Sequence, residues 1–212
     1  MITVKSFEFN GFGVNTYVLI NDNNNCVVVD PGCYTKSEQK RFDDFIDFSG
    51  LTIEKQLITH CHIDHILGIA HIEDKYGVGA WIHPAGKEFL RASVGYASVF
   101  GFHLERPVVP VGFIIEGEPI FLGKERFDVL YTPGHAEGSV CLVYHEQKMV
   151  FTGDVLFRES IGRTDLPTGN YDLLIKNIKD KLLTLGDDYT VYPGHMNVST
   201  IGHEKLNNPY LE

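Results

Sequence analysis

The densest group of chemically capable side chains in this sequence lies between residues 60 and 65. Four potential metal ligands, His60, His62, Asp64 and His65, follow directly after the apolar run 56–59. Such a run predicts a buried strand that opens into a loop. Residues two apart in an extended segment point the same way, so His60 and His62 can bind one ion, and the turn that follows lets Asp64 reach a second. Imidazole and carboxylate suit zinc, or less specifically iron and manganese.

Three further predicted strands each end in a glycine that is followed by a ligand-type residue. The corners are Pro-Gly-His at 133–135, Thr-Gly-Asp at 152–154 and Pro-Gly-His at 193–195. Glycine lets the backbone turn sharply at such a corner. The corners add His135, Asp154 and His195 to the first four residues, which gives seven candidate ligands. Seven ligands are enough for two ions that share one carboxylate.

These motifs, together with the Val-Asp-Pro-Gly segment at 29–32, span nearly the whole sequence. In this pattern the sequence resembles the metallo-β-lactamase superfamily and, within it, the glyoxalase II-like hydrolases. Segments 160–167 and 199–209 are similar to the short, single-domain bacterial branch. The resemblance implies a mixed α/β (α+β) fold, a four-layer αβ/βα sandwich with metal ions at one edge of its two sheets. It also implies one domain over residues 1–212.

The resemblance distributes the ligands between two divalent ions, zinc in the first place and iron or manganese as alternatives. It implies a first site formed by His60, His62 and His135, a second site formed by Asp64, His65 and His195, and a bridge formed by Asp154. Asp30 stands at the end of a predicted strand, and we expect it to orient a ligand histidine through the second ring nitrogen. The alternative for Asp30 is an ordinary turn residue before Pro31.

The chemistry that such a centre offers is hydrolysis. Zinc lowers the pKa of bound water from about 15.7 toward about 7, so hydroxide becomes available at neutral pH. We hypothesise a metal-bridging hydroxide that attacks a thioester carbonyl, with Asp64 and Asp154 as the catalytic carboxylates. The sequence shows no Ser or Cys nucleophile with a histidine partner in a recognisable motif. The resemblance implies a small thioester such as S-lactoylglutathione as the substrate.

Glutathione as the carrier thiol is less certain than the thioester itself. Eukaryotic-type glyoxalase II carries an additional C-terminal helical domain with basic residues for glutathione, and this sequence ends at Glu212 without one. Three alternatives in the same superfamily share most of the ligands: an iron-dependent persulfide dioxygenase, which is the runner-up, a lactonase, and a true β-lactamase. The last is disfavoured because that branch usually has cysteine in place of Asp154. A purely structural metal site is disfavoured because seven ligands over two ions leave room for water.

Composition argues for a compact cytoplasmic enzyme. The 18 basic and 28 acidic side chains give a net charge of −10, without a basic patch, which argues against nucleic acid as a partner. Neither a leader pattern nor an apolar run of about 18 residues predicts membrane association. Four cysteines without a CxxC pair favour a reducing compartment, and Cys61 is expected to point away from the ions. The oligomeric state stays open.

The hydrophobic periodicity predicts two rounds of strands followed by helices. Strands are expected at 3–10, 16–21 and 26–30 as an antiparallel meander, and at 80–83, 119–122, 127–131, 140–144 and 149–151. Helices are expected at 36–48, 66–76, 87–92 and 171–183. The aromatic-rich segment 93–112 reads as a loop that lines the substrate pocket, packs beneath the sandwich or forms a dimer contact.

Several other residues of chemical interest have ordinary structural interpretations. The remaining histidines lack a partner at ligand spacing, and we expect structural roles for His71, His83, His103, His145 and His203. Arg163 and Asp165 can pair with each other or reach a substrate carboxylate, and the sequence does not choose between these roles.

Overall fold

The first half of the chain forms a mixed six-stranded sheet with helices on one face. The computed structural model describes residues 1–212. The sheet has the order β1-β2-β3-β4-β5-β6, with antiparallel pairs from β1 to β3 and parallel pairs from β3 onward. Its elements are β1 (Thr3–Phe9), β2 (Val14–Ile20), β3 (Asn25–Val29), α1 (Lys36–Phe48), β4 (Thr52–Leu57), α2 (Ile63–Ile66), α3 (Ile69–Tyr76), β5 (Ala80–Ile82), α4 (Lys87–Ala97) and β6 (Gly112–Phe113).

The second half forms another six-stranded sheet, in the order β14-β13-β10-β9-β8-β7. Only β10 and β13 pair in parallel, and a separate hairpin of β11 with β12 lies beside this sheet. The elements are β7 (Ile120–Leu122), β8 (Glu125–Tyr131), β9 (Val140–Tyr144), β10 (Met149–Gly153), β11 (Leu156–Phe157), β12 (Ser160–Ile161), α5 (Tyr171–Asn177), β13 (Thr190–Pro193), β14 (Ser199–Thr200) and α6 (Ile201–Asn207).

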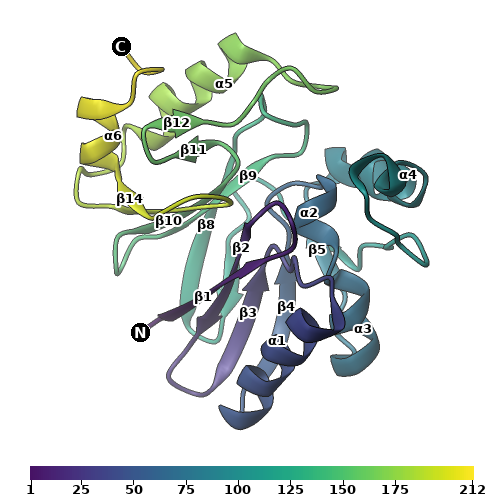
Figure 1. Ribbon diagram of the computed structural model, residues 1–212. Coiled ribbons are helices and arrows are strands. Elements are labelled where there is room, and N and C mark those ends of the chain that lie inside the picture. The colour runs from purple at the N-terminus through teal and green to yellow at the C-terminus, as the bar shows by residue number, and fades with distance from the viewer.

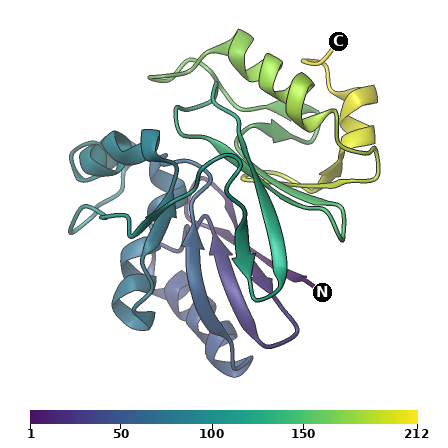
Figure 2. The same cartoon turned by 180° about the vertical axis from the view of Figure 1, so that it is seen from behind.

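The two sheets pack face to face, and helices cover both outer faces (Figure 1). Side chains of β3 alternate between two cores, as a strand buried on both faces requires. Val27 and Val29 pack in the core between the sheets, whereas Cys26 and Val28 pack under α1 and α3. Seen from behind, α5 and α6 lie on the opposite outer face (Figure 2). The four-layer sandwich expected from the sequence is therefore confirmed.

Helix α1 illustrates how local sequence sets an element. Thr35 accepts a hydrogen bond from the backbone of Glu38, and the Glu38 carboxylate accepts one from the backbone of Thr35, which completes a capping box. Phe42 and Ile46 are buried under the first sheet, and the Phe42 ring centroid lies 6.1 Å from that of Phe7. The predicted bounds 36–48 are correct because the cap and the apolar stripe agree.

The helix predicted at 66–76 has the correct end but the wrong start, because α3 begins at Ile69. The chain forms α2 and α3 with a break at Leu67 and Gly68. The Gly68 backbone lies against the preceding loop, where its N–H donates to the Pro31 carbonyl at 2.7 Å. A Cβ at this position would lie 2.6 Å from the Cys33 sulfur, so tertiary packing interrupts the helical pattern.

Two other helices also differ from the sequence prediction. Helix α4 continues through Ala97 instead of ending at residue 92, and a 3₁₀ turn extends to Phe100. The first part of the predicted loop 93–112 is therefore helical. The predicted helix 171–183 begins as α5 and continues through a π-helical turn at Ile178–Leu182. The strand predicted at 56–59 is β4, which starts earlier and ends at Leu57, and polar residues at its half-exposed positions obscured the pattern.

The structure contains no helix that is both long and apolar enough to cross a membrane.

We predict that Phe42→Ala lowers the free energy of unfolding by about 3–5 kcal/mol, because it leaves a cavity under the first sheet. Phe48 is the matched control in the same helix, since this residue is 88% exposed. Phe48→Ala should change stability by less than about 0.5 kcal/mol. Urea unfolding of both variants checks this, and similar losses for the two substitutions would contradict the packing described for α1.

Candidate metal centre

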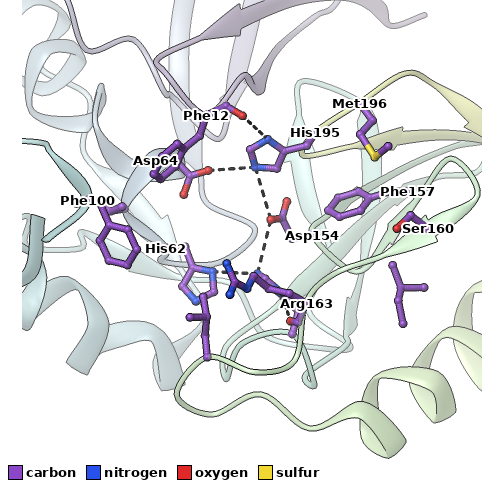
Figure 3. A pocket seen from close by; sticks show the side chains of 14 residues that line it. Phe12, His62, Asp64, Phe100, Asp154, Phe157, Ser160, Arg163, His195 and Met196 are labelled. Atoms are coloured by element: carbon purple, nitrogen blue, oxygen red, sulfur yellow. Dashed lines mark hydrogen bonds and ion pairs between the residues drawn. The ribbon is translucent and has the colours of Figure 1, made fainter. Parts of the chain in front are cut away.

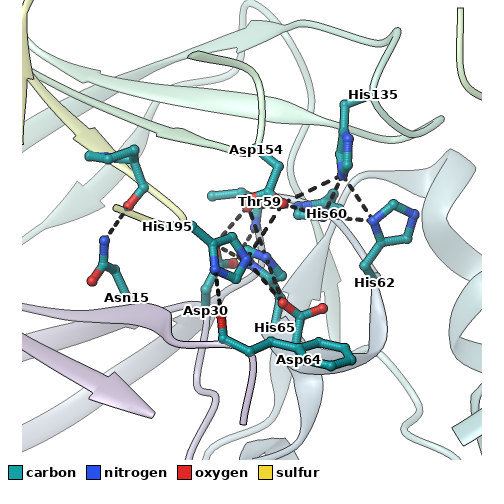
Figure 4. Close-up of polar contacts among 12 residues, drawn as sticks. Asn15, Asp30, Thr59, His60, His62, Asp64, His65, His135, Asp154 and His195 are labelled. Carbon is teal, nitrogen blue, oxygen red and sulfur yellow. Dashed lines mark hydrogen bonds and ion pairs between the residues drawn. The ribbon is translucent and has the colours of Figure 1, made fainter. Parts of the chain in front are cut away.

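The seven candidate ligands meet at one edge of the sandwich (Figure 4). The segment between β4 and α2 supplies His60 and His62, and the first turn of α2 supplies Asp64 and His65. The other three residues follow the ends of β8, β10 and β13, and they are His135, Asp154 and His195. The ends of neighbouring strands thus bring together residues that lie far apart in the sequence.

Three imidazoles form a first group. His60 Nε2 lies 3.1 Å from His62 Nδ1 and 3.2 Å from His135 Nε2. The third side of this triangle, from His135 Nε2 to His62 Nδ1, measures 2.9 Å. Neutral imidazoles that face one another in this way present lone pairs, so a cation among them would remove their repulsion. The group has the composition of a three-histidine metal site.

A second group combines one carboxylate with two imidazoles. Asp64 Oδ2 lies 3.0 Å from His195 Nε2 and 3.5 Å from His65 Nε2. The three ligand atoms lie within 4.8 Å of one another. This group therefore also offers three converging donor atoms, with oxygen and nitrogen mixed.

Asp154 lies between the two groups. Its Oδ2 atom is 3.6 Å from His135 Nε2 in the first group and 3.6 Å from His195 Nε2 in the second. Its Oδ1 atom is 3.3 Å from His65 Nε2. A single carboxylate thus faces both groups at similar distances, which is the placement that a bridging ligand requires.

Oxygen atoms hold the second ring nitrogen of four of these histidines. His65 Nδ1 donates to Asp30 Oδ2 at 3.0 Å, and His60 Nδ1 lies 3.2 Å from Thr59 Oγ1. Backbone carbonyls hold the other two: Arg163 O lies 2.8 Å from the Nδ1 of His135, and Phe12 O lies 3.1 Å from the Nδ1 of His195. Each contact leaves Nε2 of that ring free to face the cluster.

Asp30 has the contacts that an orienting residue needs. Besides His65, its carboxylate accepts from the Thr59 backbone at 2.7 Å and from the Thr59 hydroxyl at 2.6 Å. Asp30 is buried and has a left-handed φ of 50°, a strained conformation for a residue other than glycine. These bonds fix the carboxylate between two segments of the ligand loop, in agreement with the role expected for it.

Burial and the surrounding charges shift the pKa values of the cluster in opposite directions. Burial and the neighbouring imidazoles together lower the pKa of His62 to about 4 and that of His60 well below its usual range. Burial also acts to lower the pKa of His65, but Asp64 and Asp154 outweigh it and raise that pKa well above the usual range. The carboxylates thus favour a positive charge at the centre of the cluster.

Among the buried polar atoms without a hydrogen-bond partner, two belong to the cluster, namely His65 Nε2 and Asp154 Oδ1. Orphaned buried polar atoms are costly unless something else satisfies them. Both face the cluster, so a metal ion there would satisfy both. The nitrogen and oxygen donors fit zinc, iron or manganese. Cys61 is buried with a free thiol and belongs to neither group, as expected.

Two asparagines that the sequence did not single out hold the ligand loops in place. Asn10 Nδ2 donates to the backbone carbonyl of Asp64 at 3.0 Å. The Asn15 backbone donates to Gly194 at 2.7 Å, and its side chain donates to the Met196 carbonyl at 2.8 Å. A Cβ at Gly194 would lie 2.2 Å from Asp154 Oδ1, so this corner admits only glycine. The β1–β2 hairpin therefore fixes segments that carry two of the ligands.

The remaining histidines lie outside the two ligand groups. His71 Nε2 lies 2.9 Å from Asp43, His203 Nε2 lies 2.9 Å from Glu159, and His145 Nδ1 lies 2.6 Å from the hydroxyl of Tyr189. His83 stacks on Tyr131 with a centroid separation of 4.1 Å, and His103 lies beside a different surface cavity. Of the two roles considered for Arg163, the structure shows the ion pair with Asp165, at 2.7 and 2.6 Å.

A cavity of about 530 Å³ opens onto the cluster (Figure 3). About half of its lining is apolar, and the rest consists of ligand residues of the cluster, among them Asp64, Asp154 and His195, with Ser160 and Arg163. Phe100 belongs to the segment 93–112 and lines this cavity. Of the three roles considered for that segment, lining the pocket therefore agrees with the structure. The volume is typical of a site for a small molecule.

Comparisons with known proteins agree with this geometry. The family model described as the metallo-beta-lactamase superfamily matches residues 10–195. The hydroxyacylglutathione hydrolase GloC of Haemophilus influenzae is 35% identical over 212 residues, which cover 99% of this chain and 98% of that protein.

Two solved structures are similar over nearly their whole length. The B3 metallo-β-lactamase BLEG-1 has a TM-score of 0.89 and 32% identity, over 99% of each chain. TTHA1623, solved in a di-iron-bound form, has a TM-score of 0.88 and 30% identity, over 98% of this chain and 100% of its own. With the family model, the fold and the converging histidines and carboxylates in agreement, this chain belongs to the metallo-β-lactamase superfamily and is one of its metallo-hydrolases.

Proposed function

We propose that this protein is a glyoxalase II-like thioester hydrolase that acts on a small thioester such as S-lactoylglutathione. The observation that carries the proposal is the pair of ligand groups joined by Asp154 at the floor of a substrate-sized cavity. The similarity to GloC over the whole chain supports the thioester as substrate class. In the overall reaction water adds hydroxyl to the acyl carbon, the carbon–sulfur bond breaks, and the thiol leaves with a proton.

We assign the ligands as the two groups suggest. His60, His62 and His135 would hold one divalent ion, Asp64, His65 and His195 would hold the other, and Asp154 would contact both. When bound, such ions lower the pKa of water and polarise a carbonyl oxygen. Zinc is the metal that we favour, because imidazole and carboxylate donors suit it.

The protein's own side chains have three tasks in this proposal. The Asp64 carboxylate accepts hydrogen bonds, so besides holding an ion it can orient the attacking water, and Asp154 keeps the two ligand groups together. Asp30 and Thr59 keep the ligand histidines in fixed orientations through their second ring nitrogens. The walls of the cavity restrict water and hold the acyl carbon next to the cluster.

An iron-dependent persulfide dioxygenase is the second candidate. The observation that keeps iron open as the metal is that TTHA1623, which matches over 98% of this chain and 100% of its own, was solved in a di-iron-bound form. The donor set does not discriminate, since imidazole and carboxylate suit iron as well as zinc. Lactone and β-lactam hydrolysis belong in the same substrate panel, the latter because BLEG-1 is described as a B3 metallo-β-lactamase.

We also propose a reducing, cytoplasmic location. All four cysteines are buried and free, in agreement with the reading of the sequence.

We predict that Asp154→Ala removes most of the bound metal and nearly all turnover, because each ion loses a ligand and two like charges face each other unscreened. Asp30→Ala is the comparison, since it keeps every proposed ligand and should reduce metal affinity or activity by about 10–100-fold. Elemental analysis and turnover of both variants decide the matter. Equal, mild effects of the two substitutions would contradict the bridging role of Asp154.

The reaction itself gives another prediction. Zinc-loaded protein should release free thiol from at least one small thioester, detected with a thiol reagent. A chelator should abolish the release and added zinc should restore it, because the ligand side chains alone neither lower the pKa of water nor polarise the carbonyl.

The decisive contrast is with the oxygen-consuming alternative. If no thiol appears across the panel while an iron-loaded sample consumes oxygen with glutathione persulfide, the hydrolase proposal is wrong.

A further inference from the structure

The cavity beside the ligand cluster exposes apolar side chains on two sides. Figure 3 shows Phe12 and Phe100 on one side, and Phe157 and Met196 on the other, with Asp64 and Asp154 between them. Phe12, Phe100 and Met196 are 47%, 40% and 57% exposed. When a ligand displaces water from apolar surface in a cavity, binding is stabilised by about 25 cal/mol for each Å² of apolar surface that it buries.

The side formed by Phe12 and Phe100 is supported from behind by further aromatic rings. The Phe12 ring lies edge-to-face with Phe100 at 6.3 Å and with Phe102 at 5.3 Å between centroids. Tyr96 lies 6.2 Å from Phe100, and its hydroxyl donates to the carbonyl of Cys61 next to the ligand histidines. The fold thus holds the side formed by Phe12 and Phe100 in place, and the Tyr96 hydrogen bond links this side to the ligand loop. These contacts keep the rings at a fixed distance from the cluster.

Recognition of a charged carrier has little support in the same cavity. Arg163 is the one basic residue among those that line it, apart from the ligand histidines. Its guanidinium already makes a two-pronged pair with Asp165, at 2.7 and 2.6 Å. Glutathione brings two carboxylates and an ammonium group, which would have to give up water without an equal number of partners here.

We propose that the cavity selects its substrate by an apolar group attached to the thioester, with the aromatic side around Phe100 as the recognition surface, and not by the charges of a peptide thiol. This inference rests on the proposed thioester hydrolysis and narrows its substrate class. An uncharged thioester with a longer or aromatic apolar group would cover Phe12, Phe100 or Met196, whereas lactoyl and acetyl groups would leave them wet.

Two series of thioesters test the proposal with the metal-loaded protein. In the first, the thiol is N-acetylcysteamine throughout and the acyl group runs from acetyl through butyryl and hexanoyl to benzoyl. In the second, the acyl group is constant and the thiol is glutathione, N-acetylcysteamine or an alkyl thiol. Thiol release gives kcat and KM for each member.

We expect kcat/KM to rise by about two- to fourfold for each added methylene in at least one series, as burial of a methylene group allows. The series in which kcat/KM rises shows whether the acyl group or the thiol contacts the apolar side chains of the cavity. N-acetylcysteamine thioesters should match or exceed the glutathione thioesters of the same acyl group.

Variants locate the recognition surface. Phe100→Ala and Met196→Ala, on opposite sides of the cluster, each keep every proposed ligand. Phe100→Ala should flatten the dependence on chain length more than Met196→Ala does, and a slope that only Met196→Ala flattens would contradict the role proposed for the side around Phe100. Phe48→Ala removes an equally large ring, 88% exposed on α1, and should leave that dependence unchanged. Circular dichroism and metal content, equal to those of the unmodified protein, show that a flattened slope does not come from misfolding.

The outcomes separate this inference from the function on which it rests. If thioesters are hydrolysed but kcat/KM is flat in both series, or falls with each methylene, the apolar recognition is wrong while the hydrolase proposal stands. If kcat/KM for glutathione thioesters is tenfold or more above that for the other thiols at a constant acyl group, the cavity recognises the charges of glutathione and the apolar recognition is wrong. If no thioester in either series is hydrolysed, the proposed function itself fails.

Discussion

The need to compensate buried charge governs the organisation of this molecule. Asp30, Asp64 and Asp154 are all buried, within reach of the same small set of imidazoles. Carboxylates so far from water are stable only when cations or hydrogen-bond donors surround them. The Thr59 backbone and hydroxyl, with His65, satisfy Asp30. Asp64 and Asp154 instead face the open centre of the cluster, where positive charge is favoured. The same arrangement makes a metal centre stable when its ions are bound and leaves orphaned atoms without them.

Much of the fold could be predicted because local and long-range signals agree in it. Lys36–Phe48 carries both a capping box and an apolar stripe, so its bounds are correct to the residue. Most strands of the two sheets followed from alternating or continuous apolar runs, but the two-residue strands β6 and β14 were not predicted. Only the family resemblance supplied the order in which the strands pack. Failures occurred where tertiary contacts overrode local pattern: the close approach of Gly68 to Cys33 delays the start of the helix predicted at 66–76 to Ile69. Helix α4 runs on to Ala97 because Leu90, Ser93 and Ala97 form one buried face, in which the Ser93 hydroxyl is satisfied by the Leu90 carbonyl.

The site, like the fold, could be predicted only in part from the sequence. The candidate ligands were visible in the sequence because metal-binding chemistry requires particular residue types at strand ends, and the structure brings all seven together. The residues that hold them were not visible. Asn10 and Asn15 act through backbone carbonyls of distant loops, and an asparagine near a turn has many ordinary explanations. The carbonyls of Phe12 and Arg163, which orient His195 and His135, have no sequence signature at all, since every residue has a carbonyl.

The central claim is that two ions bind per chain, one in each group, with Asp154 between them. The most direct measurement is a crystal structure of protein reconstituted with excess zinc, with the ions located by anomalous scattering and their number checked by elemental analysis. The account predicts two ions per chain, the first among His60, His62 and His135, the second among Asp64, His65 and His195, and the Asp154 carboxylate in contact with both. A single ion in the first group, with the second group empty even in excess zinc, would contradict it.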